Sequence, residues 1–297
     1  MEAYIREEKT YIDGIPCDFL CHLQTADCSG SVYPAHYHSY IELLFGLEGE
    51  FRIFLNGSWH QWKAGDLVVI SAEEVHHIYA LSDHGGTYIV VRFMPEFLQN
   101  DLAGSGIDPG YLRPLLSSEA LQEKVISREE MHGSEVPRLF HKILKETGEK
   151  EYAYELAVRS HLLGIYLWMI RYWHRQNPAF FNYTARDREL FRALEPALTY
   201  MNENFRQNIS AGSLAELCGF SYSYFSRSFQ RLMHRKIPDY LNSLRVAEAE
   251  KLLISTSMSV TEIALATGFE TSSYFIKIFR RYKNLSPRQF RKMLEQV

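Results

Sequence analysis

Three histidines and one glutamate in the first third of the chain carry side chains that bind metal ions or polar ligands. His36, His38 and Glu42 are separated by even numbers of residues, so on an extended strand they project from the same face. His76 lies on a later segment that can return beside them as the next hairpin. Three imidazoles and a carboxylate can hold zinc, iron, manganese or nickel with coordination positions left for a ligand. The same groups can instead line a barrel mouth and hydrogen-bond a small polar ligand or one another.

Aromatic residues near these four can supply the flat apolar walls that sugars or aromatic ligands need. We assign Tyr40 and Trp59 to an effector site with His36, His38, Glu42 and His76, and note Tyr33 and Trp62 as further wall residues. Aromatic residues at strand spacing also form ordinary cores. We prefer an organic effector as the ligand, with no certain cofactor, and keep a divalent transition metal held by the three histidines and Glu42 as the alternative.

The elements that must position these residues are predicted to be short strands. Residues 50–55 alternate in polarity before Asn56-Gly57, a strong hairpin signal, and residues 58–62 return. Several short strands at this spacing predict a small barrel or sandwich.

A second set of residues able to do chemistry lies in a sequence repeat near the C-terminal end. Ser223-Tyr-Phe-Ser-Arg-Ser-Phe-Gln-Arg231 recurs 50 residues later as Ser273-Tyr-Phe-Ile-Lys-Ile-Phe-Arg-Arg281. A short apolar run precedes each copy and ends in Gly219-Phe220 or Gly268-Phe269. Glycine tolerates the positive φ that a sharp turn between two helices needs. Each copy therefore predicts a helix-turn-helix.

The second helix of each copy divides into a core face and a polar face. Phenylalanines at i and i+4, which are Phe225, Phe229, Phe275 and Phe279, share one face and predict core anchors. The opposite face suits a DNA major groove, because arginine reads guanine, glutamine reads adenine and isoleucine meets the thymine methyl. The predicted DNA-binding residues are Ser223, Ser226, Arg227, Gln230, Arg231, Ser273, Ile276, Lys277, Arg280 and Arg281. Arg231, Arg281 and Lys283 suit phosphates better than bases. The alternative is that these are solvated basic faces of ordinary helical hairpins.

Two family resemblances follow from these motifs. The second copy, with Gly268-Phe269, Tyr274-Phe275 and Ser286-Pro287, resembles the signature of the AraC/XylS family of bacterial transcription regulators. That resemblance implies two recognition helices on one DNA face, held by a connecting helix over residues 238–255, with Arg227 and Lys277 in successive major grooves about 34 Å apart.

The N-terminal motif resembles the cupin superfamily. Gly30-x5-His36-x-His38-x3-Glu42-x6-Gly49 matches the first cupin motif, and Gly65-x5-Ser71-x4-His76 resembles the second. The second motif departs from the family pattern at Ser71, where proline is usual, and at Glu73, where glycine is usual. The resemblance implies an all-β cupin barrel, or jelly roll, which is the usual sensor domain in one large branch of the AraC family.

Two helices are predicted between the barrel and the DNA module. Residues 136–148 are amphipathic, and residues 152–173 are strongly apolar. The buried candidates on the second helix are Leu156, Leu163, Tyr166, Leu167 and Ile170. The family precedent implies that such a pair packs on the barrel and forms a homodimer, and packing within one chain is the alternative. Residues 101–116, rich in glycine and proline, predict a surface loop or short helix, and Pro196 is expected in the first turn of the helix that opens the DNA module.

Charge and composition support two cytoplasmic domains. From Asp187 on, the chain has 16 basic and 11 acidic residues, whereas the preceding part has 16 basic and 25 acidic residues. This distribution suits a DNA-binding domain joined to a domain that does not bind DNA. The four cysteines contain no Cys-x-x-Cys pair, and no apolar run approaches the ~20 residues of a membrane span. We predict an effector-sensing domain over residues 1–180, with a helical dimerisation segment at about 119–176, and a DNA-binding domain over 187–297.

The sequence thus predicts a non-enzymatic transcription regulator controlled by a small-molecule effector, a sugar or related metabolite. Its expected partners are double-stranded DNA, the effector, a second copy of the chain and, if it is an activator, RNA polymerase. The alternatives are a metal-dependent cupin enzyme or metal sensor with an appended DNA-binding module, and a constitutive regulator with a purely structural barrel.

Overall fold

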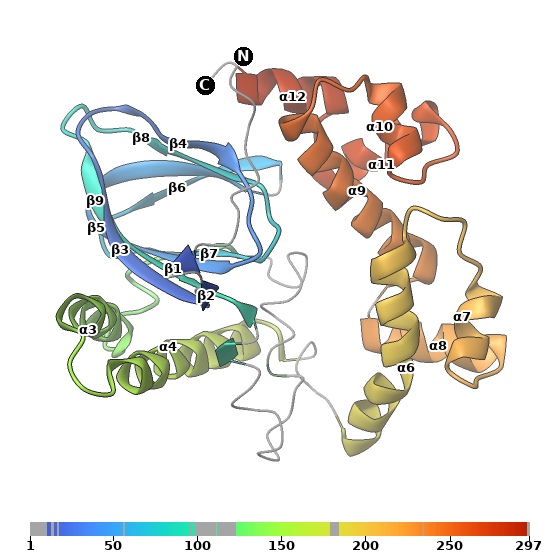
Figure 1. Ribbon diagram of the computed structural model, residues 1–297, viewed down its shortest axis with the longest axis horizontal. Helices are drawn as coiled ribbons and strands as arrows, with labels where there is room; N and C mark the ends of the chain where they lie inside the picture. Colours follow the sequence, from blue (N-terminus) through green and yellow to red (C-terminus); the bar gives the residue numbers. More distant parts are fainter. Residues whose placement is uncertain are drawn as a thin grey trace. The chain divides into compact units, whose positions relative to one another are not determined.

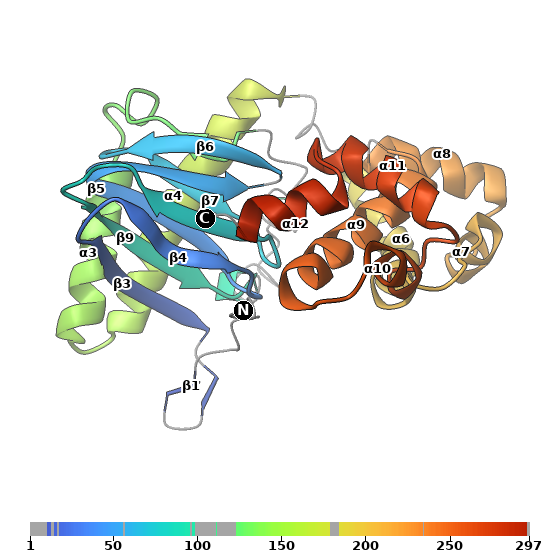
Figure 2. The same cartoon turned by 90° about the horizontal axis from the view of Figure 1, so that it is seen from above.

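The computed structural model describes residues 11–12, 15–16, 18–55, 57–95, 97–98, 111, 123–178, 184–233 and 235–295. The chain forms two compact units that divide between residues 182 and 183 (Figures 1 and 2). The first is built mainly of strands and the second of helices. The predicted loop over residues 101–116 lies outside the described residues except for Tyr111.

The N-terminal unit consists of antiparallel strands arranged around one long strand, β5. The first half of β5 pairs with β9 and β7, and its second half pairs with β8 and β6, so β5 belongs to both layers. β3 extends the first layer beyond β9, β10 extends it beyond β7, and β4 extends the second layer beyond β8. The strands are β1 (Tyr11–Ile12), β2 (Ile15–Pro16), β3 (Phe19–Ala26), β4 (Gly30–His36), β5 (Ile41–Leu55), β6 (Ser58–Lys63), β7 (Leu67–Ile70), β8 (His76–Ala80), β9 (Gly86–Phe93) and β10 (Val125–Ile126).

These strands confirm the predicted strand-rich, cupin-like unit. Leu55 pairs directly with Ser58, which confirms the hairpin expected at Asn56-Gly57, although Asn56 itself lies outside the described residues. Backbone pairing among the described strands does not close into a complete barrel.

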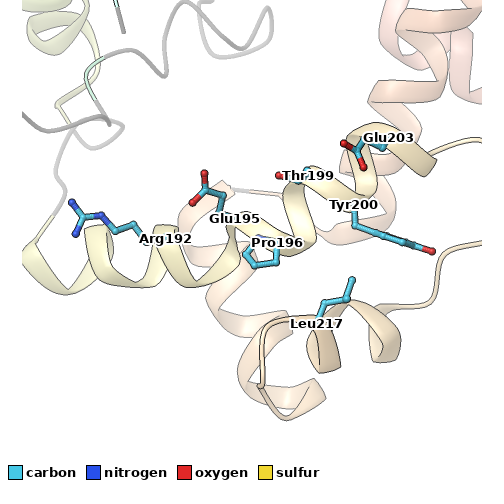
Figure 3. A pocket seen from close by; sticks show the side chains of 7 residues that line it. All are labelled: Arg192, Glu195, Pro196, Thr199, Tyr200, Glu203 and Leu217. Carbon is cyan, nitrogen blue, oxygen red and sulfur yellow. The ribbon is translucent and has the colours of Figure 1, made fainter. Parts of the chain in front are cut away.

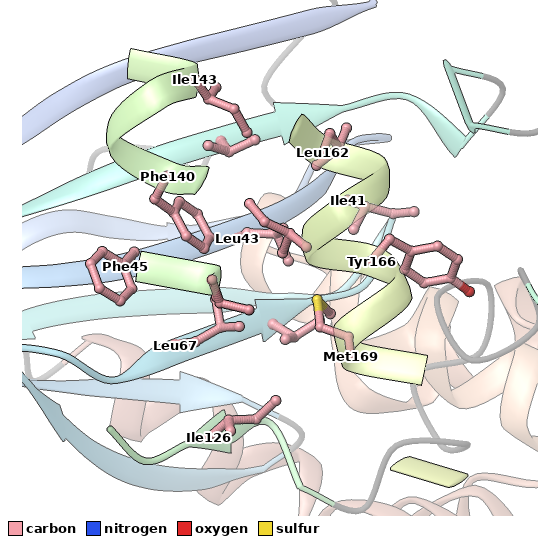
Figure 4. Close-up of a cluster of buried hydrophobic side chains, with 14 of the residues drawn as sticks. Ile41, Leu43, Phe45, Leu67, Ile126, Phe140, Ile143, Leu162, Tyr166 and Met169 are labelled. Carbon is pink, nitrogen blue, oxygen red and sulfur yellow. The ribbon is translucent and has the colours of Figure 1, made fainter. Parts of the chain in front are cut away.

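Two helices, α3 (Val136–Glu149) and α4 (Tyr154–Gln176), cover one face of the β3-β9-β5-β7 layer. Figure 4 shows how the buried side chains of the strands and helices meet there, including Ile41, Leu43, Phe45, Phe140, Leu162 and Tyr166. The other face of this layer contributes Leu44, Val68, Val90 and Tyr88 to a separate core between the two layers.

The prediction of buried residues on α4 was partly wrong. Tyr166 is buried, and Leu163 and Ile170 pack against the edge of the core. Leu156 is 70% exposed and Leu167 is 43% exposed. The reason is geometric, because one face of a helix lies against the sheet and apolar residues elsewhere on its circumference cannot reach that core.

The C-terminal unit contains only helices in its described part. They are α6 (Ala185–Asn204), α7 (Ala211–Leu217), α8 (Tyr222–Met233), α9 (Ile237–Ser255), α10 (Val260–Ala266), α11 (Ser272–Lys283) and α12 (Pro287–Glu295). α7-α8 and α10-α11 are the two predicted helix-turn-helix pairs, and α9 is the predicted connecting helix. The expectation for Pro196 was wrong, since it lies inside α6. A capping box between Thr184 and Asp187 starts this helix earlier.

Candidate functional site

The four predicted ligand residues come together at one end of the space between the two strand layers. His36 ends β4 and pairs with His76 at the start of β8, Glu42 lies near the start of β5, and His38 lies in the connection between β4 and β5. One ligand atom from each residue can be chosen so that all lie within 4.8 Å of one another, and all four side chains are buried. We call this group the His-Glu cluster.

Glu42 is the centre of the contacts in this cluster. Its Oε2 lies 2.9 Å from Nε2 of His38 and 3.0 Å from Nε2 of His76. Its Oε1 accepts a hydrogen bond from Nε of Arg92 at 3.0 Å. Arg92 was not among the residues predicted for this site; it reaches the cluster because β9 pairs Arg92 directly opposite Glu42.

Backbone carbonyls fix the orientation of all three imidazole rings. Nδ1 of His36, His38 and His76 lies 2.9, 3.1 and 2.9 Å from the carbonyl oxygens of Pro34, Tyr40 and Glu74 respectively. Because a carbonyl oxygen only accepts, each Nδ1 donates its proton and each Nε2 is the atom left to bind at the cluster. Imidazoles that ligate metals are oriented by this kind of outer hydrogen bond.

Burial and neighbouring charges set the ionisation of the cluster. Burial, reinforced by His76, lowers the pKa of His36 well below its usual value, so this ring is neutral at neutral pH. Burial alone would raise the pKa of Glu42, but Arg92 and the imidazoles of His38 and His76 lower it well below its usual value. Glu42 is therefore an anionic acceptor beside the cationic Arg92.

A buried ion pair supports the segment that carries His76. Glu74 Oε2 accepts hydrogen bonds from the backbone N–H of Ser71 and from Nζ of Lys124, both at 2.9 Å. Lys124 also donates to Oγ of Ser71 at 3.0 Å. Ser71 thus replaces the usual proline of the cupin motif with a residue that joins this network.

The other departure from the motif has a conformational consequence. Glu73 adopts a φ of 63°, so it keeps the left-handed turn that the usual glycine would form. Its N–H donates to the carbonyl oxygen of His38 at 2.7 Å, which ties the turn before β8 to the cluster.

Of the two aromatic residues assigned to the effector site, only Tyr40 lies at the cluster. Its ring is buried, with a centroid 5.8 Å from that of His38. Trp59 pairs with Phe54, and Phe54 pairs with His77, so these three side chains lie on the opposite face of their sheet from His76. There the guanidinium of Arg52 lies 4.5 Å from the ring centroid of Trp59. The structure does not bring Trp59 together with the His-Glu cluster.

The two helix-turn-helix copies place their side chains as the repeat predicts. Phe225 and Phe229 of α8 and Phe275 and Phe279 of α11 are completely buried, which confirms the core anchors. Nine of the ten predicted DNA-binding residues are exposed, and Ser226 is half-buried. The turns are also alike, since Ser221 and Thr271 each accept a hydrogen bond from the backbone N–H three residues later.

All three basic residues expected to contact phosphates form ion pairs within the unit. Arg231 lies 2.7 Å from Asp187, and Arg281 lies 3.3 Å from Asp239. Lys283 is buried and pairs with Glu250 of α9 at 2.5 Å. The expectation that Lys283 contacts DNA phosphates was wrong, because its position in the helix directs it into the contact between α11 and α9.

A groove on the helical unit is lined by none of these basic residues. It runs along α6 toward α7, has a volume of about 440 Å³ and is lined by Arg192, Glu195, Pro196, Thr199, Tyr200, Glu203 and Leu217 (Figure 3). Its two carboxylates make it unsuited to DNA phosphates.

Two family models match the chain. The model of the AraC-like ligand binding domain matches residues 21–165, and a helix-turn-helix domain model matches residues 214–293. Among the described residues, no helix has the length and apolar character needed to cross a membrane.

Several known proteins are similar to all or part of this chain. The melibiose operon regulatory protein of Escherichia coli K12 is 33% identical over 99 residues, so the chain spans 33% of the length of this curated relative, and the match includes 33% of this chain. The HTH-type transcriptional activator RhaS of Mannheimia succiniciproducens is 24% identical over 270 residues, covering 88% of this chain and 90% of that protein. A solved AraC-type DNA-binding domain-containing transcriptional regulator from Chromobacterium violaceum is 30% identical, covering 35% of this chain and 94% of that one, with a TM-score of 0.33.

Proposed function

Because the chain belongs to the AraC/XylS family of transcription regulators, we propose that it binds specific DNA sequences through α8 and α11 under the control of a small molecule bound in its strand-rich unit. The observation that supports the DNA-binding role is that α8 and α11 are divided in the same way into a buried face and an exposed face. Each helix buries two phenylalanines completely and exposes a face of polar and basic side chains. An exposed face of this kind on a well-anchored helix can enter a major groove without unfolding the unit.

Base reading is assigned mainly to Arg227, Gln230, Ile276 and Lys277. Arg227 donates from Nε to the backbone carbonyl of Ser223 at 3.1 Å, which holds the stem of its side chain along the helix. This leaves the terminal nitrogens of the guanidinium to read a guanine edge.

Selection of bound duplexes from a random DNA library by the full-length protein tests this role. Arg227→Ala should lose about 1–3 kcal/mol of discrimination at one base position of the selected sequence. If the variant binds all duplexes more weakly by one factor and keeps its sequence preference, Arg227 contacts phosphate and the assignment is refuted.

The ligand proposed for the strand-rich unit is a polar organic effector such as a sugar or related metabolite. The His-Glu cluster offers imidazole Nε2 atoms, an anionic carboxylate and the adjoining Arg92 guanidinium in a buried setting with the ring of Tyr40 nearby. Hydroxyl groups can donate to Glu42 or to an imidazole Nε2 and accept from Arg92. A ligand acts only if it binds one arrangement of the regulator better than another.

The route from the cluster to the helices is short. Ile41 and Leu43 flank Glu42 on β5 and point to the opposite face, where they belong to the core shared with α3 and α4 (Figure 4). A shift of β5 on ligand binding would therefore change the packing of α4, the helix that precedes the connection to α6.

Thermal unfolding in the presence of sugars and sugar acids tests the effector proposal. A ligand at about 100 times its Kd should stabilise the unit by ~2.7 kcal/mol. Double replacement of His36 and His38 by alanine should abolish this shift and effector-dependent transcription, while DNA binding without effector is retained. Unchanged induction in this variant would place the pocket elsewhere, and no shift with any candidate would favour the purely structural barrel.

A divalent metal is the second candidate for this site, and the donor chemistry supports it. His36, His38 and His76 would bind through Nε2 and Glu42 through a carboxylate oxygen, a set that suits zinc, iron, manganese or nickel. Such an ion would supply a Lewis-acidic anchor for an effector, or would itself be the signal. Elemental analysis of protein purified without chelator should then find about one transition metal per chain and none in His36→Ala, whereas no metal in either protein refutes this candidate.

We assign this protein no catalytic role, because the relatives described above are named as transcription regulators. We propose instead that it works in the cytoplasm as a homodimer and that, if it is an activator, it contacts RNA polymerase. The exposed Leu156 and Leu167 of α4 support a dimer contact. Sedimentation equilibrium should give a dimer for the wild type and a monomer for Leu156→Glu with Leu167→Glu, and a monomeric wild type would refute the contact.

A further inference from the structure

Each recognition helix carries in its last turn an arginine that is ion-paired inside its own unit. Arg231 of α8 lies 2.7 Å from Oδ1 of Asp187 on α6, and Arg281 of α11 lies 3.3 Å from Oδ1 of Asp239 on α9. The two arginines are equivalent, because each is the last residue of its copy of the repeated motif.

The two aspartates are equivalent as well. Asp187 is the third residue of α6 and Asp239 is the third residue of α9. α6 precedes the first helix-turn-helix, and α9 precedes the second. The repeat therefore extends over three helices, α6-α7-α8 and α9-α10-α11, with the same ion pair joining the first and third helix of each copy.

Moving Arg231 from Asp187 to a DNA phosphate would be unfavourable. The Asp187 side chain is only 7% exposed. Its Oδ2 already accepts hydrogen bonds from the N–H of Thr184 at 3.0 Å and from the hydroxyl of Thr184 at 2.7 Å. Removing the arginine would leave an anionic group buried without its cation, which costs more than an exposed pair gains. The carboxylate would also lie close to the phosphate and repel it.

We propose that Arg231 and Arg281 are positioning residues, which hold α8 on α6 and α11 on α9, and that neither binds a phosphate. This inference rests on the proposed DNA-binding function and revises the phosphate role that the sequence suggests. The first pair should matter more, because Asp239 is 32% exposed in the second and is therefore better solvated.

The two roles predict opposite effects when the aspartate loses its charge. If Arg231 is a positioning residue, Asp187→Asn loosens α8 and weakens binding. If Arg231 is a phosphate contact, Asp187→Asn releases the guanidinium, removes a repulsive charge and strengthens binding. Asparagine keeps an oxygen at this position for capping the start of α6.

The test uses the full-length protein and the duplex that the wild type selects from a random library, with binding measured by fluorescence anisotropy at several NaCl concentrations. We expect Asp187→Asn and the double variant to weaken binding by a similar factor of up to about five, because both lose the ion pair and leave no buried anion. Arg231→Gln should weaken binding at least as much, since Asp187 then keeps its charge without this partner. The slope of log affinity against log salt should stay at the wild-type value. Arg281→Gln and Asp239→Asn should show the same pattern with smaller factors.

Arg280→Gln is the matched control, since Arg280 is exposed on α11 and is not assigned to base reading, so its loss should reduce the salt slope by about 1 as a phosphate contact. A slope reduced by about 1 in Arg231→Gln, or tighter binding by Asp187→Asn, would overturn the proposal. Circular dichroism of each variant checks that the helices are retained, and Arg231→Lys, which restores a cation, should recover part of the lost affinity. If the wild type selects no sequence, the proposed function is refuted. If the wild type is selective but Arg231→Gln has the reduced slope or Asp187→Asn binds more tightly, only this inference is refuted.

Discussion

The equivalent glycines in the two helix-turn-helix turns should respond differently to the same substitution. Gly219 and Gly268 both have positive φ, at 66° and 86°. A Cβ added at Gly219 would meet no atom within 4 Å. A Cβ added at Gly268 would lie 2.5 Å from the backbone oxygen of Arg206, in the connection between α6 and α7. Because the obstructing atom is backbone, no side chain can rotate away to relieve this contact.

These contacts set the expected magnitudes. Alanine in a left-handed conformation costs about 1–2 kcal/mol, which applies to both Gly219→Ala and Gly268→Ala. Forcing an extra carbon into a packed position typically costs about 1–3 kcal/mol more, which applies only to Gly268→Ala. The expected losses are therefore about 1–2 kcal/mol for the first variant and about 2–5 kcal/mol for the second.

Urea unfolding of the full-length chain can separate the two units. All four tryptophans lie at or before residue 173, so tryptophan fluorescence reports on the strand-rich unit alone. The helical circular dichroism signal comes mainly from the C-terminal unit. Gly268→Ala should lower the midpoint of the dichroism transition more than Gly219→Ala and leave the fluorescence midpoint unchanged. Equal losses in the two variants would refute the packing of the second turn against Arg206.

Three further predictions use the same unfolding measurements. Phe279→Ala should cost about 3–5 kcal/mol, whereas Ile276→Ala on the exposed face of the same helix should stay within about 0.5 kcal/mol of wild type, and similar losses would contradict the assigned faces. Arg245→Met should lower the free energy of unfolding by about 1–3 kcal/mol, because it removes charged hydrogen bonds of 2.8 and 2.9 Å to two backbone carbonyls beyond the end of α6. An unchanged free energy of unfolding would show that water replaces these hydrogen bonds. Burial and a nearby arginine lower the pKa of His77 from 6.5 to about 4. Because His77 binds a proton more tightly in the unfolded chain, the free energy of unfolding followed by fluorescence should fall as pH drops from 6.5 to 4. His77→Gln should reduce this pH dependence, and an unchanged pH dependence in the variant would assign it to other groups.

Local sequence patterns predicted the helical unit well. The repeat, the glycine at each turn and the paired phenylalanines depend on residues within one or two helical turns, so they can be read directly. The start of α6 was misplaced because Pro196 was taken as a first-turn signal, whereas the capping box of Thr184 and Asp187 begins the helix. The pairing of Arg231 with Asp187 could not be read, since the two residues lie on different helices and meet only after packing.

In the strand-rich unit, spacing predicted the residues of the cluster but not all of their neighbours. Even spacing put His36, His38 and Glu42 on one side, and the motif of the second hairpin supplied His76. Trp59 was assigned to the same site because it is aromatic and close in sequence, yet strand register places it on the opposite face. Arg92 was missed because nothing near it in sequence distinguishes it from any arginine at the end of an apolar strand.

By itself, then, the sequence determined the two kinds of unit, the duplicated helix-turn-helix and the four residues of the His-Glu cluster, because each rests on short-range periodicity or a compact motif. Only the tertiary structure decided which charges are paired and which faces are shared. Arg92 reaches Glu42 through strand register, Lys283 is withdrawn from the surface by Glu250, and Arg231 and Arg281 are held by aspartates on other helices. The physical reason is that a side chain's charge and type are local properties, whereas its partner, its burial and hence its role depend on elements far away in the chain.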